Sequence, residues 1–197
     1  MSVQLPTIRL AAPQDAAAIH DIYAPIVRDT AISFEWEVPT LAEVRSRIDR
    51  VLADGFPWLV AEVAGQVGGY AYASAFRSRI AYSWTAEVSV YVHSEHHRRG
   101  IGRSVYGSLL RLLELQGYRS AYGIATTPNP GSERLHRTLG FQQVGHFPRV
   151  GYKFGAWHDV ICWHITLGPQ DLAPEPIRPV SEVLRNIGPA GVIGRSW

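Results

Sequence analysis

The chain has 197 residues, 46% of them hydrophobic and 18% charged, and its 19 lysines and arginines nearly balance 17 aspartates and glutamates. This apolar fraction excludes an intrinsically disordered chain, and a net charge of +2 is too small to predict nucleic-acid binding. The single cysteine excludes an intrachain disulfide and a cysteine-based zinc site. The sequence contains neither an apolar run of about 20 residues nor a secretory signal, so we expect a cytoplasmic protein without membrane or nucleic-acid partners.

The first quarter of the chain predicts a strand and two helices. Residues 7–10 alternate like a short strand, and residues 14–28 show helical spacing of apolar side chains. Pro25 lies inside that second run, so the helix should end or kink near Tyr23 or Ala24. A firmer helix begins after Thr40, which forms a capping box with Glu43, and stops before Gly55.

The middle of the chain predicts three strands and a long helix. Residues 58–63 and 67–75 form a hairpin pattern around a short glycine turn. Residues 85–93 alternate strictly between valines and polar or aromatic side chains, as expected for a strand with one buried face. An amphipathic helix then runs from the Gly100-Ile101-Gly102 segment to Gln116, with Gly117 as its stop.

The last third predicts a strand at residues 120–126, a helix at 132–139 and strands at 141–146 and 158–167. This order implies an α/β protein with a mixed sheet. From Gly168 onward prolines become frequent, which predicts an extended tail rather than a second domain. We therefore expect one domain over residues 1–168 and a proline-rich C-terminal tail over residues 169–197.

The segment with the clearest chemical signal is the end of the 85–93 strand and the loop that follows. Gly100 and Gly102 precede a helix, where unpaired backbone N–H groups and the helix dipole attract anions. Arg98 and Arg99 add positive charge, so the loop suits a phosphate or pyrophosphate. Taken alone, the glycines favour an ordinary helix start, because short Gly-x-Gly motifs are common. A P-loop and a dinucleotide-binding fingerprint are both excluded, because neither pattern of residues is present.

The loop also resembles a known family. His97-Arg98-Arg99-Gly100-Ile101-Gly102 is similar to the acetyl-CoA pyrophosphate loop of the GNAT superfamily of N-acetyltransferases, although His97 departs from the usual first residue. Asn129, Leu135-His136 and Gly140-Phe141 resemble the second half of that family's CoA site.

Further strings resemble the phosphinothricin N-acetyltransferase group within this superfamily. They are spread over residues 7–168 and include Asp29-Thr30-Ala31-Ile32-Ser33-Phe34-Glu35, Ala81-Tyr82-Ser83-Trp84-Thr85-Ala86-Glu87 and Gly155-Ala156-Trp157-His158-Asp159-Val160. The resemblance implies the GNAT fold, a twisted mixed sheet of about seven strands flanked by four helices. It further implies acetyl-CoA as co-substrate, no metal, a small amino-acid-like acceptor and a homodimer.

The resemblance also implies roles for particular residues. Glu87 matches the general base that takes a proton from the acceptor ammonium, and His136 lies where an acid or orienting group would act on the departing thiolate. The expected cofactor residues are Val90, Tyr91, Val92, His97, Arg98, Arg99, Gly100, Ile101, Gly102 and Asn129. The expected acceptor residues are Phe34, Arg77, Arg79, Tyr82, Val88 and Ser89.

The arginines among these residues favour an anionic acceptor. Arg77 and Arg79 stand two apart at a predicted strand end, so both guanidinium groups should share a face and suit a carboxylate or phosphinate. The predicted reaction is therefore direct acetyl transfer to the α-amine of phosphinothricin, in detoxification or self-resistance. Three alternatives remain open at this point: methionine sulfoximine or sulfone as acceptor, a protein or peptide acceptor, and a non-catalytic acyl-CoA sensor.

Overall fold

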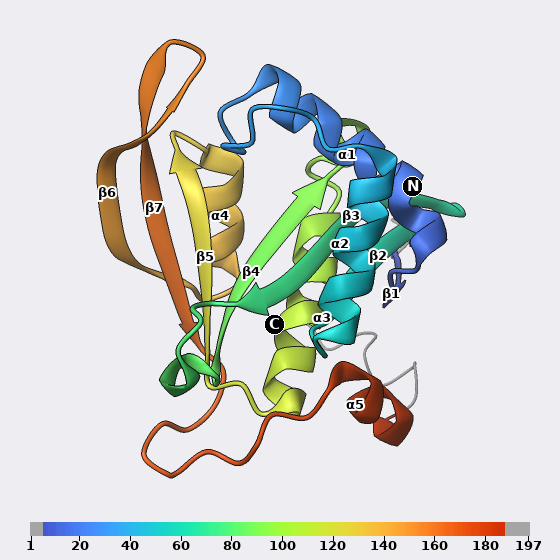
Figure 1. Cartoon of the computed structure of the whole chain (residues 1–197), viewed down its shortest axis with the longest axis vertical. Coiled ribbons are helices and arrows are strands. Elements are labelled where there is room, and N and C mark those ends of the chain that lie inside the picture. The colour runs from blue at the N-terminus through green and yellow to red at the C-terminus, as the bar shows by residue number, and fades with distance from the viewer. Residues whose placement is uncertain (1–5, 188–197) are drawn as a thin grey trace.

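The computed structural model describes residues 6–187, which form a seven-stranded mixed sheet in the order β1-β2-β3-β4-β5-β7-β6 (Figure 1). Neighbouring strands are antiparallel except for the parallel pair β4 and β5. This arrangement confirms the predicted sheet. The strands are β1 (Thr7–Leu10), β2 (Trp58–Val63), β3 (Gln66–Ala75), β4 (Thr85–Val92), β5 (Ser120–Thr127), β6 (Gln142–Lys153) and β7 (Ala156–Thr166).

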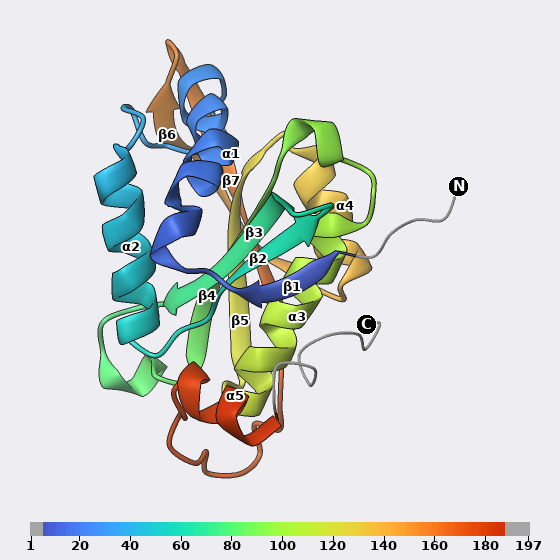
Figure 2. The same ribbon diagram turned by 90° about the vertical axis from the view of Figure 1, so that its right-hand side faces the viewer.

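Helices cover both faces of the sheet, and Figure 2 shows the two layers edge on. One face carries α1 (Ala16–Asp29) and α2 (Leu41–Ala53), and the other carries α3 (Ile101–Gln116) and α4 (Pro130–Thr138). A fifth helix, α5 (Val180–Ile187), lies against the C-terminal end of α3. The described residues therefore hold one α-helix more than the four that were predicted.

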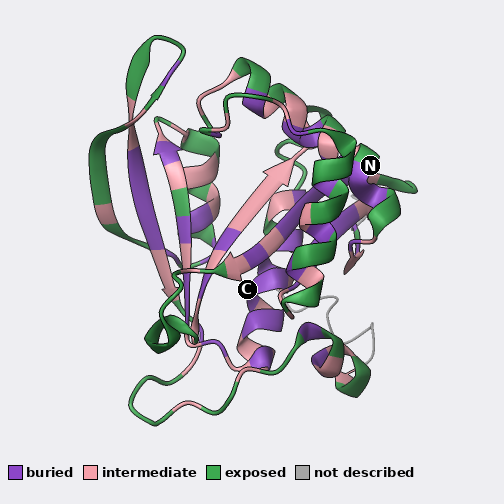
Figure 3. Ribbon diagram, in the orientation of Figure 1, coloured by how far each residue is buried: buried purple, intermediate pink, exposed green. Residues whose placement is uncertain are grey.

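Two apolar cores explain why the helices lie where they do. Strand β2 supplies both, because Trp58 and Val60 face α1 and α2 while Leu59 and Ala61 face α3. Figure 3 shows the buried stripes on the sheet and on the inward sides of the helices. The alternation in sequence thus places a helix layer on each side of the central strands.

The capping box predicted for α2 is confirmed. The Thr40 hydroxyl accepts a hydrogen bond from the backbone N–H of Glu43 at 3.2 Å, and the Glu43 carboxylate accepts one from the Thr40 backbone at 2.7 Å. Two of the N–H groups that a helix start leaves unpaired are satisfied in this way.

Of the two outcomes predicted at Pro25, an end or a kink of the helix near Tyr23 or Ala24, the end was wrong. Helix α1 continues through Pro25 to Asp29. Proline removes one backbone hydrogen bond, but Ile22, Tyr23 and Val27 are buried on the same side of the helix. Their packing compensates for the missing bond, so tertiary contacts outweigh the local preference.

The C-terminal segment departs from the predicted extended conformation only at α5, since residues 167–179 hold neither helix nor strand. Val180 and Val183 of α5 are each 2% exposed and belong to the core beside α3. The side-chain amide of Gln116 donates to the carbonyls of Gly55 and Arg178, both at 2.8 Å, and so joins α3 to the end of α2 and to this segment. Residues 188–197 of the predicted tail lie outside the described part of the chain, and the domain boundary at residue 168 stays a prediction.

The last two strands are longer than predicted. Strand β6 continues to Lys153, and β7 already begins at Ala156. The two strands form a hairpin that extends past the rest of the sheet in Figure 1. Within residues 6–187, no helix is both long enough and apolar enough to cross a membrane.

Candidate active site

The sheet opens between its two parallel strands. Residues Thr85–Val88 of β4 pair with Ser120–Gly123 of β5, and the strands part beyond these four residue pairs. The rest of β4 remains paired with β3, and the rest of β5 with β7. Figure 1 shows the two strands diverging toward one end of the molecule. The opening leaves one backbone edge of each strand without a strand neighbour, so main-chain groups at positions such as Val90 and Val92 are available to an extended ligand.

The glycine loop lies at the mouth of this opening. A Cβ added to Gly102 would stand 3.3 Å from side-chain atoms of both Val92 and Leu135, so the first turn of α3 lies between β4 and α4. Gly100 caps the helix in the left-handed conformation with φ of +81°, and nothing lies within 4 Å of the position a Cβ would take. The open space, the helix N-terminus and the exposed arginines Arg98 and Arg99 fit a pyrophosphate group.

The remaining predicted cofactor residues surround the same opening. The imidazole of His97 is hydrogen-bonded to the carbonyl of Val92 at 3.0 Å, which fixes the loop to the end of β4. Asn129 caps α4, where its side-chain oxygen accepts from the backbone N–H of Ser132 at 3.1 Å, and its amide group is left for another partner. Tyr91 instead turns its ring toward α1, 5.1 Å from Tyr23 between ring centroids, and it pairs with Tyr70 of β3.

Glu87 lies at the closed end of the opening. It stands on β4 opposite Tyr122 of β5 and Ser74 of β3, and its side chain is partly buried. Burial raises the pKa of the Glu87 carboxyl, and the nearby charge of Arg77 opposes this shift. A carboxylate that gains a proton more readily than usual is suited to act as a general base.

An aromatic row that no sequence pattern indicated borders Glu87. Phe76 stacks on Tyr122 with centroids 4.6 Å apart, and Tyr122 lies 4.8 Å from the His164 ring. Cys162 lies two residues before His164 on β7 and is buried. Burial raises the pKa of its thiol, the charge of Glu87 raises it further, and that of Arg77 lowers it. These residues come together only because β7 pairs with β5, a strand order that local patterns do not reveal.

The two arginines predicted to bind the acceptor lie together, although not for the predicted reason. Strand β3 ends at Ala75, so Arg77 and Arg79 occupy an irregular loop rather than a strand end. Both still line one cavity of about 410 Å³ together with Tyr82 and Thr85. The Arg77 guanidinium lies 5.0 Å from the centroid of Phe76 and 6.0 Å from that of Tyr82. Positive charge is therefore held beside the aromatic row and Glu87.

Of the two acceptor residues predicted on β4, only one presents its side chain to this region. Val88 is 3% exposed and belongs to the core under α3, so only its main chain can take part. Ser89 follows on the Glu87 face, opposite Tyr72 of β3. Phe34 lies in the loop between α1 and α2 and packs against the β6–β7 hairpin.

His136 lies behind the sheet, on the α3 side. Its Nδ1 is 2.8 Å from the carbonyl of Ser132, and its Nε2 is 3.2 Å from the hydroxyl of Tyr106. The ring stacks on Trp163 at 5.5 Å, and burial lowers its pKa. The imidazole is thus held neutral with both nitrogens engaged, next to Gly123 at the point where the strands part. A catalytic role for His136 stays a prediction.

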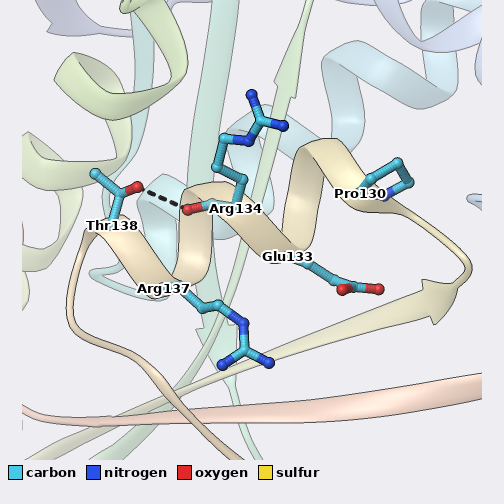
Figure 4. A pocket seen from close by; sticks show the side chains of 5 residues that line it. All are labelled: Pro130, Glu133, Arg134, Arg137 and Thr138. Atoms are coloured by element: carbon cyan, nitrogen blue, oxygen red, sulfur yellow. Dashed lines mark hydrogen bonds between the residues drawn. The ribbon is translucent and has the colours of Figure 1, made fainter.

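A second hollow of about 480 Å³ lies on the outer face of α4 (Figure 4). Its lining residues are Pro130, Glu133, Arg134, Arg137 and Thr138. In Figure 4 the two arginines leave the helix in opposite directions, so they do not converge on one anion. None of the predicted site residues lines this hollow, so it is not part of the opening between β4 and β5. Among residues 6–187, no cluster of three or more His, Cys, Asp or Glu side chains could hold a metal ion.

Comparison with known proteins agrees with this geometry. Residues 8–162 match the acetyltransferase (GNAT) domain family. A phosphinothricin N-acetyltransferase from Streptomyces viridochromogenes is 40% identical over 176 residues, which are 89% of this chain and 95% of that protein. An L-methionine sulfoximine/L-methionine sulfone acetyltransferase from Salmonella typhimurium is 36% identical over 82% of this chain and 94% of its own.

A solved structure shows the same fold with a ligand. The crystal structure of a GNAT phosphinothricin acetyltransferase from Sinorhizobium meliloti in complex with acetyl-CoA has a TM-score of 0.85 and 33% identity to this chain, over 90% of this chain and 98% of that one. A putative acetyltransferase from Salmonella typhimurium, also solved with acetyl-CoA, has a TM-score of 0.83. Sequence and fold thus agree, and the chain belongs to the GNAT family of acetyltransferases.

Proposed function

We propose that this protein transfers the acetyl group of acetyl-CoA to the α-amine of a small anionic amino-acid analogue, with phosphinothricin as the first candidate. The observation that carries the proposal is the position of Glu87, a partly buried carboxylate with a raised pKa at the closed end of the opening and beside Arg77. The relatives that act on phosphinothricin, at 40% and 38% identity, support this choice of acceptor.

The reaction follows from the placement of these groups. When bound, acetyl-CoA supplies the acetyl group as a thioester. Glu87 accepts a proton from the acceptor ammonium, so that the amine nitrogen gains a free electron pair. The nitrogen then forms a bond to the acetyl carbon as the carbon–sulfur bond breaks, and the second proton that the nitrogen loses neutralises the departing thiolate. Backbone N–H groups on the unpaired edge of β4 stabilise the negative charge that develops on the acetyl oxygen.

The other site residues hold the two substrates. In this proposal His97, Arg98, Arg99, Gly100, Ile101 and Gly102 bind the pyrophosphate, while the main chains of Val90, Tyr91 and Val92 and the amide of Asn129 bind the pantetheine arm. Arg77 and Arg79 bind the anionic groups of the acceptor, and Phe34, Tyr82 and Ser89 enclose it. His136 holds the Tyr106 hydroxyl beside the reacting thioester.

A substrate panel tests the proposal directly. Purified protein is given acetyl-CoA with phosphinothricin, methionine sulfoximine, methionine sulfone or a mixed peptide pool, and release of free thiol is followed. We expect saturable turnover with phosphinothricin and weaker turnover with the two methionine derivatives, which relatives at 36% and 33% identity acetylate. Turnover on peptides alone would replace the proposal with a protein acetyltransferase, and acetyl-CoA binding without turnover would indicate a sensor.

We further propose that the protein works as a homodimer in the cytoplasm, where acetyl-CoA is available. The β6–β7 hairpin exposes six large apolar side chains, each about half accessible: Val144, Phe147, Val150, Tyr152, Phe154 and Trp157. Apolar surface of this kind is typical of a protein–protein contact.

Light scattering after size exclusion tests the dimer. The wild-type protein is expected at twice the monomer mass, and Val150→Glu should shift it to the monomer because a charge would be buried in the contact. Gln143→Glu introduces the same charge at an exposed polar position of the hairpin and should leave the mass unchanged. A wild-type monomer would contradict the proposal.

A further inference from the structure

The loop between α1 and α2 covers the acceptor side of the sheet without any regular secondary structure. Residues 30–40 connect the two helices and carry Phe34, which is 36% exposed. The carboxylate of Glu35, in the same loop, accepts a hydrogen bond from the Tyr23 hydroxyl at 2.9 Å, and the Tyr23 ring lies 5.1 Å from that of Tyr91 on β4. The loop therefore lies over the face of the sheet that holds the proposed base.

Lys153 is joined to this loop from a distant part of the chain. It ends β6, is only 1% exposed, and belongs to the hairpin rather than to either helix. Its ammonium donates to the carbonyl of Val27 at 2.7 Å and to that of Ser33 at 2.8 Å. The first carbonyl lies in the last turn of α1, where backbone acceptors lack helical partners and a cation is favoured by the helix dipole.

Burying an ammonium is unfavourable unless hydrogen bonds or a counter-charge compensate for the lost hydration. Burial lowers the pKa of Lys153, and the negative charge of Glu35 opposes this. A methionine of similar length would fill the space without that cost. The ammonium therefore contributes something that apolar packing would not, namely hydrogen bonds to two main-chain carbonyls. These carbonyls belong to the end of α1 and to the loop that follows it.

The position of Phe34 depends on the same contact. Ser33, whose carbonyl Lys153 holds, directly precedes it, and a Cβ on Gly151 would collide with the Phe34 ring. Phe34 thus rests on the bare backbone of the hairpin, two residues before Lys153. On the other side, Arg47 donates to both carboxylate oxygens of Glu35 at 2.7 and 3.1 Å.

We propose that Lys153 is a positioning residue for the acceptor site, which fixes the 30–40 loop to the β6–β7 hairpin and so sets the place of the Phe34 ring. The proposal rests on the function proposed above, since it takes the Phe34 wall to be part of the acceptor site. The cofactor loop lies elsewhere, at the start of α3, so acetyl-CoA binding does not depend on Lys153.

Kinetics and hydrogen exchange of Lys153→Met test this role. We expect the KM for the acceptor to rise by about tenfold or more, because displacement of a positioning wall by about 1 Å has large effects, while the Kd for acetyl-CoA stays within a factor of about two. Backbone amide exchange should increase in residues 28–38 and not elsewhere. Arg28→Ala is the control, because it removes an exposed ion pair with Asp29 next to Val27. It should leave the acceptor KM, the acetyl-CoA Kd and the amide exchange unchanged.

Two further variants keep the proposal falsifiable if Lys153→Met does not fold. Lys153→Gln keeps one donating group and should give intermediate values, and Gly151→Ala should raise the acceptor KM by displacing the Phe34 ring directly. Unchanged acceptor KM and exchange in the Lys153 variants would overturn the proposal, as would an equal loss of acetyl-CoA affinity. If the wild-type protein acetylated no acceptor, the exchange measurement would still decide whether Lys153 holds the loop, so the two failures are distinguishable.

Discussion

Replacing Glu87 by glutamine is expected to lower kcat by about 10²- to 10⁴-fold, the usual contribution of a general base. Glutamine has nearly the same shape and still fits between Ser74 and Tyr122, but its amide cannot accept the ammonium proton. The Kd for acetyl-CoA, measured by calorimetry, should not change, because the pyrophosphate loop lies at the other end of β4. Equal kcat for variant and wild type would remove Glu87 as the base.

The pH profile gives a second measurement on the same pair of proteins. Because burial raises the pKa of Glu87, the carboxyl takes up a proton at a pH above the ordinary range for glutamate. The wild-type kcat should therefore fall as the pH decreases through this raised pKa, and the low activity of Glu87→Gln should lack that step. Glu114→Gln, which removes a surface carboxylate paired with Arg111, is the matched control and should keep both the rate and the step.

The second large effect is expected from Gly100→Val, which should weaken acetyl-CoA binding at least tenfold, or about 1.4 kcal/mol. The new side chain would extend into the open space at the start of α3, where the phosphate must approach the backbone. It would also force a branched residue into a left-handed conformation, at φ of +81°, which costs about 1–2 kcal/mol of stability.

The hairpin turn between β2 and β3 offers a control that separates these two effects. Gly65 has φ of +80° and also has nothing within 4 Å of the position a Cβ would take, but it belongs to the turn between β2 and β3 and not to the 97–102 loop. Gly65→Val should therefore lose similar stability in thermal unfolding and bind acetyl-CoA normally. If both variants bound acetyl-CoA with wild-type affinity, the loop would not be the pyrophosphate site.

The parts of the site that are contiguous in sequence were predictable. Glu87, the remainder of β4, the glycine loop and α3 follow one another, so alternation and helix-start signals place them without knowledge of the fold. Tyr122, His164 and Cys162 reach Glu87 only through the pairing of β5 with β4 and β7. No local pattern encodes that strand order, and in sequence these residues are indistinguishable from ordinary strand positions.

The errors have a common physical cause. A local rule ends a helix near Pro25 and predicts an extended chain after Gly168, yet buried side chains keep α1 helical to Asp29 and make residues 180–187 helical. Lys153 was missed for the same reason. In sequence it is a charged residue beside a turn, and only the fold brings it to carbonyls more than one hundred residues away.

The parting of β4 and β5 also carries a liability. It creates two strand edges inside the sheet, and each presents main-chain donors and acceptors that can pair with a foreign extended segment. Outer edges of sheets are commonly blunted by charge or by short length, but these two must stay accessible for function. A ligand bound in the gap would therefore reduce self-association of the protein, because it covers the two strand edges that must otherwise stay exposed for catalysis.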